Sequence, residues 1–393
     1  MDDEPLRVGV VGEQAAGERR VALTPDSIPE LTAAGMRIQL AAGAGVGSSF
    51  PDPDYTAAGA DVVAPDAGTE RAAILVSVNR PPETLLRSLA PGTTVIGLLQ
   101  PHTNPQLIHD LAAAGLTLIS LDGLPRTLSR AQVMDALTSQ ASVAGYKAAL
   151  VAATAYDRYF PLLMSAAGVA KPAQVLVLGA GVAGLQAIAT ARRLGAVVTG
   201  YDVRPETHEE IASLGAHVLQ LADVAQGSGS GGYARALDLT EQDTQRAALA
   251  ERIGRFDVVI TTAQVPGKPP PVLVTSAALD QLRPGSVVVD MAAGEWGGNV
   301  VGSQPEQQHL TTGGVTLIGA GNLAATVPRA ASAAYSRNVT ALLSHLVTDG
   351  RLRIDLDEEI QAGVVVTHGG AVVHPGAVDT TPALLSSGGG EDS

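Results

Sequence analysis

The chain has 393 residues, of which 46% are hydrophobic, 16% are charged and 3% are aromatic, with 44 glycines and no cysteine. Its 25 Lys and Arg residues against 39 Asp and Glu residues give a net charge of −14, which argues against direct binding to nucleic acid or to an anionic membrane surface. Without cysteine there are no disulfides or thiolate metal sites, and without a signal peptide or an apolar run of about 20 residues we expect an intracellular chain that does not enter a membrane.

The first third of the chain alternates strand-like and helix-like segments. Residues 7–12 (RVGVVG) indicate a buried strand, and Thr24-Pro25 supplies an N-cap and a first-position proline for a helix that runs to Gly35. Further strand candidates follow at 36–41, 61–64, 73–78, 93–99 and 117–121. This alternation predicts a parallel sheet with helices on both faces.

The rest of the chain predicts a second domain of the same kind. A long helical stretch at 129–156 is expected to cross into it, and residues 322–347 to form another long helix that returns to the first domain. The second sheet is predicted from a strand–helix–strand unit and three later strands, at 174–202, 257–261, 286–290 and 315–318. The predicted fold is therefore α/β, with two doubly wound Rossmann-like domains linked by long crossover helices. The expected boundaries are 1–136 with 322–375 for the first domain, 137–321 for the NAD-binding domain and 376–393 for a flexible tail.

A glycine-rich motif indicates a dinucleotide site. Gly179-Ala-Gly181-Val-Ala-Gly184 directly follows a strand and opens a helix, so that it allows a tight turn, close approach to a pyrophosphate and contact between helix and strand. The helix N-terminus presents N–H groups and a positive dipole end to phosphates. Asp202 ends the second strand, where an acid hydrogen-bonds the adenosine ribose 2′-hydroxyl, and NAD(H) is therefore favoured over NADP(H). Arg204 leaves NADP(H) open, since a nearby arginine can accept a 2′-phosphate.

Two further segments are candidates for the same site. The Gly/Ser-rich segment 226–233 ends in Tyr233 and is either a flexible linker or a lid that closes on a bound dinucleotide. Thr261-Thr262-Ala263 follows a strand, at the carboxyl edge where parallel sheets bind ligands.

Residues 126–147 contain a polar set that suits a nicotinamide ring. On the helix expected here, Gln132, Asp135 and Thr138 recur at i, i+3 and i+6 and share one face. Their amide, carboxylate and hydroxyl groups are suited to a ring that bears a carboxamide. A structural interpretation remains open, because Ser129 with Gln132 forms a capping-box pattern and Asp135 is a first-turn acid.

The chemistry that the sequence does not show is also informative. No Ser/His/Asp arrangement and no metal-spaced cluster stands out, so we expect no metal. His102 is the nearest candidate for an acid or base, whereas Gln100 cannot serve as one. A nicotinamide site without an evident acid or base fits direct hydride transfer to a second nicotinamide, which needs juxtaposition and exclusion of water.

Long blocks of the sequence, in a constant order, resemble two related families. ERRVALTPD (18–26) and GAGVGSSFPDPDYTAAGADV (43–62) are shared by both. The blocks that resemble one family specifically are at 129–148, 179–185, 201–206, 229–234, 261–273, 287–299, 322–343 and 357–375. That family is the NAD(H)-binding component, domain I, of proton-translocating nicotinamide nucleotide transhydrogenase, and the related family is that of the alanine dehydrogenases.

The resemblance implies a set of site residues. Gln132, Asp135 and Arg126 match the loop that orients the nicotinamide, and Thr138 keeps the hydroxyl of the family's serine. Arg130 competes with Arg126, because the stretch before Gln132 is one residue longer than the family pattern. The implied cofactor-binding residues are Val133, Met134, Gly179, Gly181, Val182, Ala183, Gly184, Asp202, Val203, Arg204, Gly232, Tyr233, Ala263 and Gln264.

The resemblance also implies partners. The family's domain I is a homodimer that docks on a membrane-spanning component and on an NADP(H)-binding domain, and hydride passes between NADH and NADP⁺ while protons cross the membrane. This chain would bind NAD(H), with NADP(H) on the partner, and be active only with its partner subunits. It would be held peripherally on the cytoplasmic face of the inner (plasma) membrane, without inserting into it and without binding nucleic acid.

Two alternatives are carried beside this interpretation. The first is an alanine-dehydrogenase-like amino-acid oxidoreductase, in which Arg20 would match an arginine that binds the substrate carboxylate. Those enzymes also use a lysine in the segment that matches 71–82 and a histidine after the next strand, whereas this chain has no lysine there and Gln100 near the histidine position. The second alternative is a non-catalytic NAD-sensing or scaffold protein, against which the presence of Gln132 and Asp135 argues.

Overall fold

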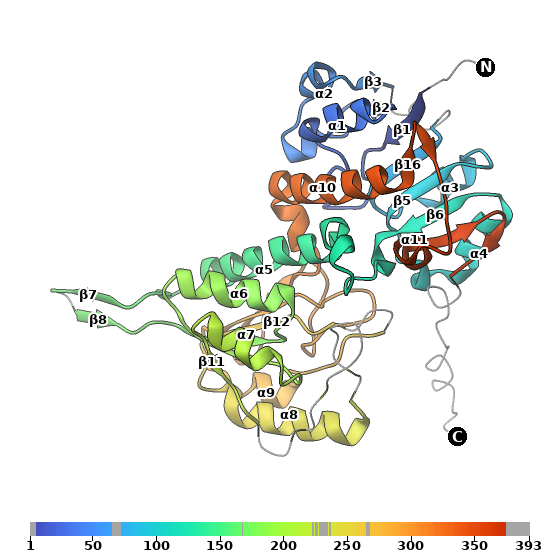
Figure 1. Cartoon of the computed structure of the whole chain (residues 1–393). Helices are drawn as coiled ribbons and strands as arrows, with labels where there is room; N and C mark the ends of the chain where they lie inside the picture. Colours follow the sequence, from blue (N-terminus) through green and yellow to red (C-terminus); the bar gives the residue numbers. More distant parts are fainter. Residues whose placement is uncertain are drawn as a thin grey trace, which may run out of the picture. The chain divides into compact units, whose positions relative to one another are not determined.

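The computed structural model describes residues 5–64, 72–166, 168–221, 224, 227, 235, 237–264 and 268–374. Contacts along the chain separate it into two compact units, whose elements are labelled in Figure 1. Unit 1 comprises Met1–Ala136 with Ser332–Ser393, and unit 2 comprises Leu137–Ala331. Each unit has a mixed α/β architecture around a sheet of mostly parallel strands, which confirms the predicted fold class.

Unit 1 is built on an eight-stranded sheet in the order β19-β18-β6-β5-β4-β1-β2-β3. The strands are β1 (Leu6–Val10), β2 (Met36–Ala41), β3 (Asp61–Val63), β4 (Ile74–Asn79), β5 (Thr94–Leu98), β6 (Thr117–Ser120), β18 (Val365–His368) and β19 (Ala371–Val372). The first six pair in parallel and match the strands predicted from the sequence, whereas β18 and β19 pair antiparallel. The chain runs outward from β1 in one direction through β2 and β3 and then in the other through β4, β5 and β6. The switch point of this sheet therefore lies between β1 and β4.

Helices bury both faces of this sheet. The helices of unit 1 are α1 (Ile28–Ala33), α2 (Asp52–Ala58), α3 (Glu83–Ser88), α4 (Pro105–Ala113), α10 (Pro328–Leu346) and α11 (Glu359–Val364). Leu75 and Val95 pack with Leu107 of α4 in one core cluster. Val76 and Ile96 point the opposite way on the same strands and are also fully buried. Because both faces are covered, the strands are continuous apolar runs instead of alternating ones.

Unit 2 has a seven-stranded sheet in the order β11-β10-β9-β12-β13-β15-β14. Its strands are β9 (Gln174–Leu178), β10 (Val197–Tyr201), β11 (His217–Val218), β12 (Val258–Thr261), β13 (Val287–Asp290), β14 (Gln308–Leu310) and β15 (Thr316–Gly319). All of these pairings are parallel except that of β14 with β15. The strands predicted for this region are confirmed, and the switch point lies between β9 and β12.

The helices of unit 2 pack against this sheet. They are α5 (Ala136–Ala155), α6 (Val182–Arg193), α7 (Thr207–Ser213), α8 (Leu239–Ile253) and α9 (Ser276–Leu279). Gly145 of α5 approaches α6 so closely that a Cβ there would lie 2.1 Å from the Ala183 carbonyl oxygen. A separate hairpin, β7 (Leu163–Ser165) with β8 (Gly168–Ala170), projects from the body of unit 2 (Figure 1).

The two long helices begin later than predicted. Residues Leu323–Thr326 form a 3-10 turn and α10 begins at Pro328, since proline lacks an N–H and is favoured in the first turn. Residues Ser129–Met134 likewise form a 3-10 helix, and α5 begins only at Ala136. Within the described residues, no helix is both long enough and apolar enough to cross a membrane.

Candidate functional site

The glycine-rich turn of unit 2 lies at the switch point of its sheet. It connects β9 to α6, and Gly181 is the N-cap of that helix. Ligands of open α/β sheets bind at the carboxyl ends of the strands, beside the switch point. Val182 and Ala183 form the first helical turn, whose backbone N–H groups suit an anion such as a pyrophosphate.

Each glycine of the motif has a distinct steric reason. Gly179 has a φ of +99°, which L side chains rarely adopt. A Cβ on Gly184 would lie 1.8 Å from the Gly179 carbonyl oxygen, so that only glycine lets α6 pack this closely on β9. A Cβ on Gly181 would meet nothing within 4 Å. The space beside Gly181 is open, as a turn that admits a phosphate requires.

Asp202 lies directly after β10 and is 9% exposed. Its Oδ2 accepts a hydrogen bond from the Ala180 backbone N–H at 2.7 Å, which ties the acid to the glycine-rich turn. The Arg204 guanidinium binds both carboxylate oxygens, with Nε 2.9 Å from Oδ1 and Nη2 2.9 Å from Oδ2. Burial would raise the pKa of Asp202, but Arg204 and the Ala180 N–H together lower it below its ordinary value. Val203, between the two, accepts a backbone hydrogen bond from Gly227 at 2.8 Å.

A pair of buried polar residues, not identified from the sequence, shapes the rest of this edge. Asn299 is fully buried, accepts from the Ala263 N–H at 3.0 Å and donates to the Ala263 carbonyl at 2.8 Å. Asp290 is also fully buried and accepts from the Thr261 hydroxyl and from two backbone N–H groups. Gln264 donates to the Met291 carbonyl at 3.2 Å. The sequence signal was present, because Asp290 ends a strand, but its partners could be named only from the fold.

The predicted nicotinamide loop belongs to unit 1 and differs from its predicted shape. Because Ser129–Met134 is a 3-10 helix and Asp135 has a non-helical ψ of 85°, Gln132 and Asp135 do not continue onto the face of α5 that carries Thr138. The face predicted at i, i+3 and i+6 is therefore wrong, as is the capping box, since the N-cap of this 3-10 helix is Leu128 and accepts no side-chain hydrogen bond.

Burial and one hydrogen bond anchor the loop. Gln132 and Val133 are exposed, with Val133 at 63%, whereas Met134 and Asp135 are buried. Asn338 of α10 donates to the Val133 carbonyl at 2.8 Å. The loop is thus fixed from below and presents the Gln132 amide to its surroundings.

The two competing arginines have different environments. Arg130 is exposed and forms ion pairs with Glu358 at 3.0 Å and Glu359 at 2.8 Å, at the start of α11. Arg126 is half-buried, and burial lowers its pKa while the charge of Asp135 opposes this change. Arg126, not Arg130, is therefore electrostatically coupled to Asp135. Gly232 and Tyr233 lie outside the described residues.

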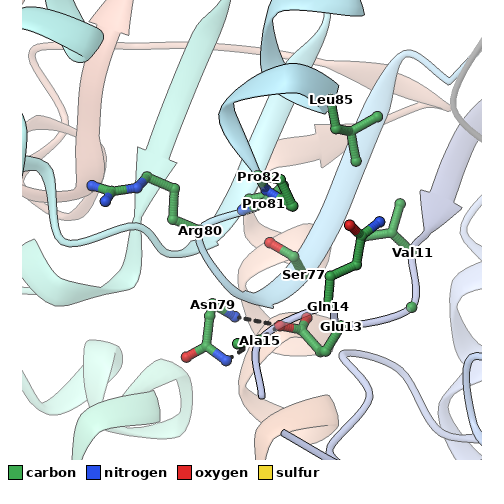
Figure 2. Close-up of a pocket in the computed structure, with 11 residues that line it drawn as sticks. Val11, Glu13, Gln14, Ala15, Ser77, Asn79, Arg80, Pro81, Pro82 and Leu85 are labelled. Atoms are coloured by element: carbon green, nitrogen blue, oxygen red, sulfur yellow. Dashed lines mark hydrogen bonds between the residues drawn. The ribbon is translucent and has the colours of Figure 1, made fainter.

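A second cavity, of about 260 Å³, lies in unit 1 beside its switch point between β1 and β4. Figure 2 shows the Glu13 carboxyl turned toward Asn79, with the Arg80 side chain extending away. Glu13 accepts from the Val78 N–H at 2.6 Å and the Asn79 N–H at 3.2 Å. Burial raises the pKa of Glu13 to about 7. The chain's own carboxyl therefore occupies the backbone donors at this crevice.

The same region bears on the amino-acid dehydrogenase alternative. Arg20 is 6% exposed, and its guanidinium binds Glu18 twice, with Nε–Oε1 at 2.8 Å and Nη2–Oε2 at 2.6 Å. The Asn79 amide, at the end of β4, donates to Glu18 at 2.8 Å. Gln100 follows β5 in a left-handed conformation, and burial lowers the pKa of the neighbouring His102. The cation that would receive a substrate carboxylate is thus engaged by an internal acid.

These observations define a class of protein. A parallel sheet, a glycine-rich turn open beside Gly181 and an acid at the end of the next strand form a dinucleotide-binding site of Rossmann type. Among the described residues, no group of three or more His, Asp and Glu side chains could hold a metal ion.

Comparisons with known proteins identify the family. Residues 9–144 match the family described as "Alanine dehydrogenase/PNT, N-terminal domain", and residues 148–375 match "Alanine dehydrogenase/PNT, C-terminal domain". The chain therefore belongs to the alanine dehydrogenase/PNT family.

Several relatives extend over nearly the whole chain. The chain is 39% identical to NAD(P) transhydrogenase subunit alpha of Cereibacter sphaeroides, over 97% of this chain and 74% of the relative. It is 37% identical to the first of the NAD(P) transhydrogenase alpha polypeptides of Rhodospirillum rubrum, over 94% of this chain and 98% of the relative. The crystal structure of transhydrogenase from Sinorhizobium meliloti matches with a TM-score of 0.82 and 40% identity, covering 94% of this chain and 99% of that one.

Alanine dehydrogenases are more distant. That of Mycolicibacterium smegmatis is 29% identical over 94% of this chain and 95% of the relative. Within the family, the chain is thus closer to the transhydrogenase alpha subunits than to this alanine dehydrogenase. The predicted family and the preference for transhydrogenase are confirmed.

Proposed function

We propose that this chain is the NAD(H)-binding subunit of a proton-translocating NAD(P) transhydrogenase. The observation that carries the proposal is the similarity to the R. rubrum alpha polypeptide over 98% of that relative, together with an open glycine-rich turn. Hydride would pass directly between NADH on this chain and NADP⁺ on a partner. The chain would be active only with its partner subunits.

The residues of unit 2 would hold the adenosine half of NAD(H). The pyrophosphate would lie against the first turn of α6, where the dipole and the N–H groups favour an anion. The ribose hydroxyls would donate to Asp202. Ala263 and Gln264, at the end of β12, would line the same edge, supported by the buried Asn299.

The residues of unit 1 would orient a nicotinamide. Gln132 can both donate to and accept from a carboxamide, and Arg126 with Asp135 forms a charged pair behind it. We assign Thr138 the role of a hydroxyl partner. Hydride transfer between two nicotinamides moves no substrate proton, so these residues would act by positioning the ring, without general acid–base catalysis.

We further propose that two copies of the chain associate through the β7–β8 hairpin. Its apolar side chains are exposed, with Met164 at 75%, Val169 at 63% and the preceding Leu162 at 52%. A projecting strand pair with large apolar groups in water marks an interaction surface. Light scattering on wild type and on Met164→Asp would test this, and a dimer of unchanged stability in the variant would reject it.

The remaining partners follow from the name of the relatives as subunits. We propose an NADP(H)-binding domain or subunit and a membrane-spanning subunit as partners. The chain would then lie peripherally on the cytoplasmic face of the inner (plasma) membrane, held by protein contacts.

The deciding experiment is hydride transfer from NADPH to an NAD⁺ analogue, with and without an added NADP(H)-binding transhydrogenase domain. We expect turnover only in the mixture. A chain that binds NADH but gives no turnover with a domain shown to be active alongside a known alpha subunit would contradict the proposal. NADH oxidation by the chain alone with pyruvate and ammonium would instead support the amino-acid dehydrogenase.

A further inference from the structure

The carboxylate of Asp202 is fully occupied in the nucleotide-free chain. Oδ1 accepts from the Arg204 backbone N–H at 3.0 Å and from Arg204 Nε at 2.9 Å. Oδ2 accepts from the Ala180 N–H at 2.7 Å and from Arg204 Nη2 at 2.9 Å. An ionised carboxylate offers about four lone-pair sites, and all four have a donor here.

A ribose can therefore reach Asp202 only by displacing donors. The two backbone N–H groups belong to the turns after β9 and β10 and hold the carboxylate in place. The two side-chain N–H groups of Arg204 are replaceable, since they sit on a rotatable chain. They form two parallel hydrogen bonds to the two carboxylate oxygens, which is the pattern that a pair of vicinal ribose hydroxyls would make.

We propose that the Arg204 side chain occupies the ribose position on Asp202 and must leave when NAD(H) binds. This rests on the proposed NAD(H) site. Arg204 is then a positioning residue that competes with the nucleotide: it neutralises and orients the buried acid in the empty site and opposes retention of the dinucleotide. Such competition weakens binding, because only the surplus over the displaced interaction appears as affinity.

The surroundings give the displaced guanidinium another place to go. The carboxylates of Glu206 and Glu210, just before and within α7, already interact electrostatically with Arg204 and are exposed. Turning toward them keeps Arg204 paired while Asp202 accepts the ribose. The same movement leaves a cation beside the 2′ position, where it would partly offset the repulsion between Asp202 and a 2′-phosphate.

The test is calorimetric titration of the full-length chain with NADH and with NADPH. For Arg204→Ala we expect NADH to bind about five- to tenfold more tightly than to wild type, while NADPH binds more weakly, since the cation is gone. The matched control is Arg193→Ala, an exposed arginine at the end of α6, which should change neither affinity. Unchanged or weaker NADH binding by Arg204→Ala would overturn the proposal, because a supporting or contacting arginine gives that sign.

Two further measurements keep the inference separate from the stability of the variant and from the proposed function. Arg204→Lys retains the charge but can fill only one carboxylate oxygen at a time, and we expect an NADH affinity between those of wild type and Arg204→Ala. In wild type, the Nε–H resonance of Arg204 should shift when ADP-ribose is added, and a resonance that stays in place while ADP-ribose binds would overturn the displacement. Absence of NADH and ADP-ribose binding by wild type would instead contradict the proposed function.

Discussion

The two units have the same kind of sheet and differ in what fills the crevice at its switch point. In unit 2, the turn after β9 leaves open space beside Gly181 and points the N–H groups of α6 into it. In unit 1, the turn after β1 carries Glu13, whose carboxyl takes the N–H groups of Val78 and Asn79. An internal acid thus stands where the other unit can admit an external anion. A shared fold does not imply a shared site, because the side chains after the first strand decide what the crevice accepts.

Gly181→Val should break the comparison most strongly. The fold tolerates a Cβ at this position, since nothing lies within 4 Å, but the added side chain fills the space for the pyrophosphate. We expect NADH affinity to fall roughly 1,000-fold, or about 4 kcal/mol, measured by calorimetry. The matched variant is Gly12→Val in unit 1, whose Cβ would meet Ala44 at an ordinary 3.8 Å and should leave NADH affinity unchanged. Equal losses in both variants would show that the units do not differ as proposed.

Arg126→Ala tests what unit 1 contributes in place of phosphate binding. Because Arg126 is half-buried and coupled to Asp135, its loss should release the loop that orients the nicotinamide. We expect hydride transfer in the reconstituted mixture to slow roughly 100-fold, with NADH affinity changed much less. Arg130→Ala, which removes only exposed ion pairs, is the control and should stay within about twofold of wild type. A larger effect of Arg130→Ala would exchange the two assignments.

Asp202→Asn addresses nucleotide choice in unit 2. The amide keeps the shape but loses the charge that repels a 2′-phosphate and one of the oxygens that accepts hydroxyls. NADH should bind roughly tenfold more weakly and NADPH more tightly, so that the preference between them narrows. Parallel titrations with both nucleotides measure this, and an unchanged ratio of affinities would remove Asp202 from the ribose site.

Glu13→Gln probes the crevice of unit 1 through pH. Burial raises the folded-state pKa of Glu13 to about 7, above its value of 4.5 in the unfolded chain. The folded chain thus holds an extra proton between these values, and stability is lost as the pH rises through this range. The substituted glutamine does not titrate, so urea unfolding should show a free energy of unfolding that falls by about 1 kcal/mol less than in wild type between about pH 5 and about pH 8.

The control for this prediction is Glu18→Gln. Although burial opposes it, the Arg20 guanidinium lowers the pKa of Glu18 to about 2, and its contribution is present above pH 4.5 and lost as the pH falls toward 2. Glu18→Gln should therefore leave the slope between about pH 5 and about pH 8 unchanged. If Glu13→Gln also keeps the wild-type slope, Glu13 does not titrate in the folded crevice.

The features of the molecule that could be predicted are those specified by short segments. Apolar runs bounded by turn residues marked the strands of both sheets, and the spacing from Gly179 to Asp202 marked the strand–helix–strand unit. The helix starts were missed where local rules compete. Residues 129–135 have a helical pattern but form a 3-10 turn, with the Val133 carbonyl bound to Asn338 from a helix that lies far along the chain.

The sequence by itself determined the fold class, the position of the dinucleotide turn and the family, because strand periodicity, glycine spacing and long ordered blocks are local in the chain. Only the tertiary structure decided which polar groups meet. It paired Arg126 with Asp135 and Arg130 with α11, set Asn299 against Ala263, and placed the Arg204 side chain on Asp202. These contacts depend on which segments the sheets and helices bring together, and the energy of a buried polar group depends on finding its partner there.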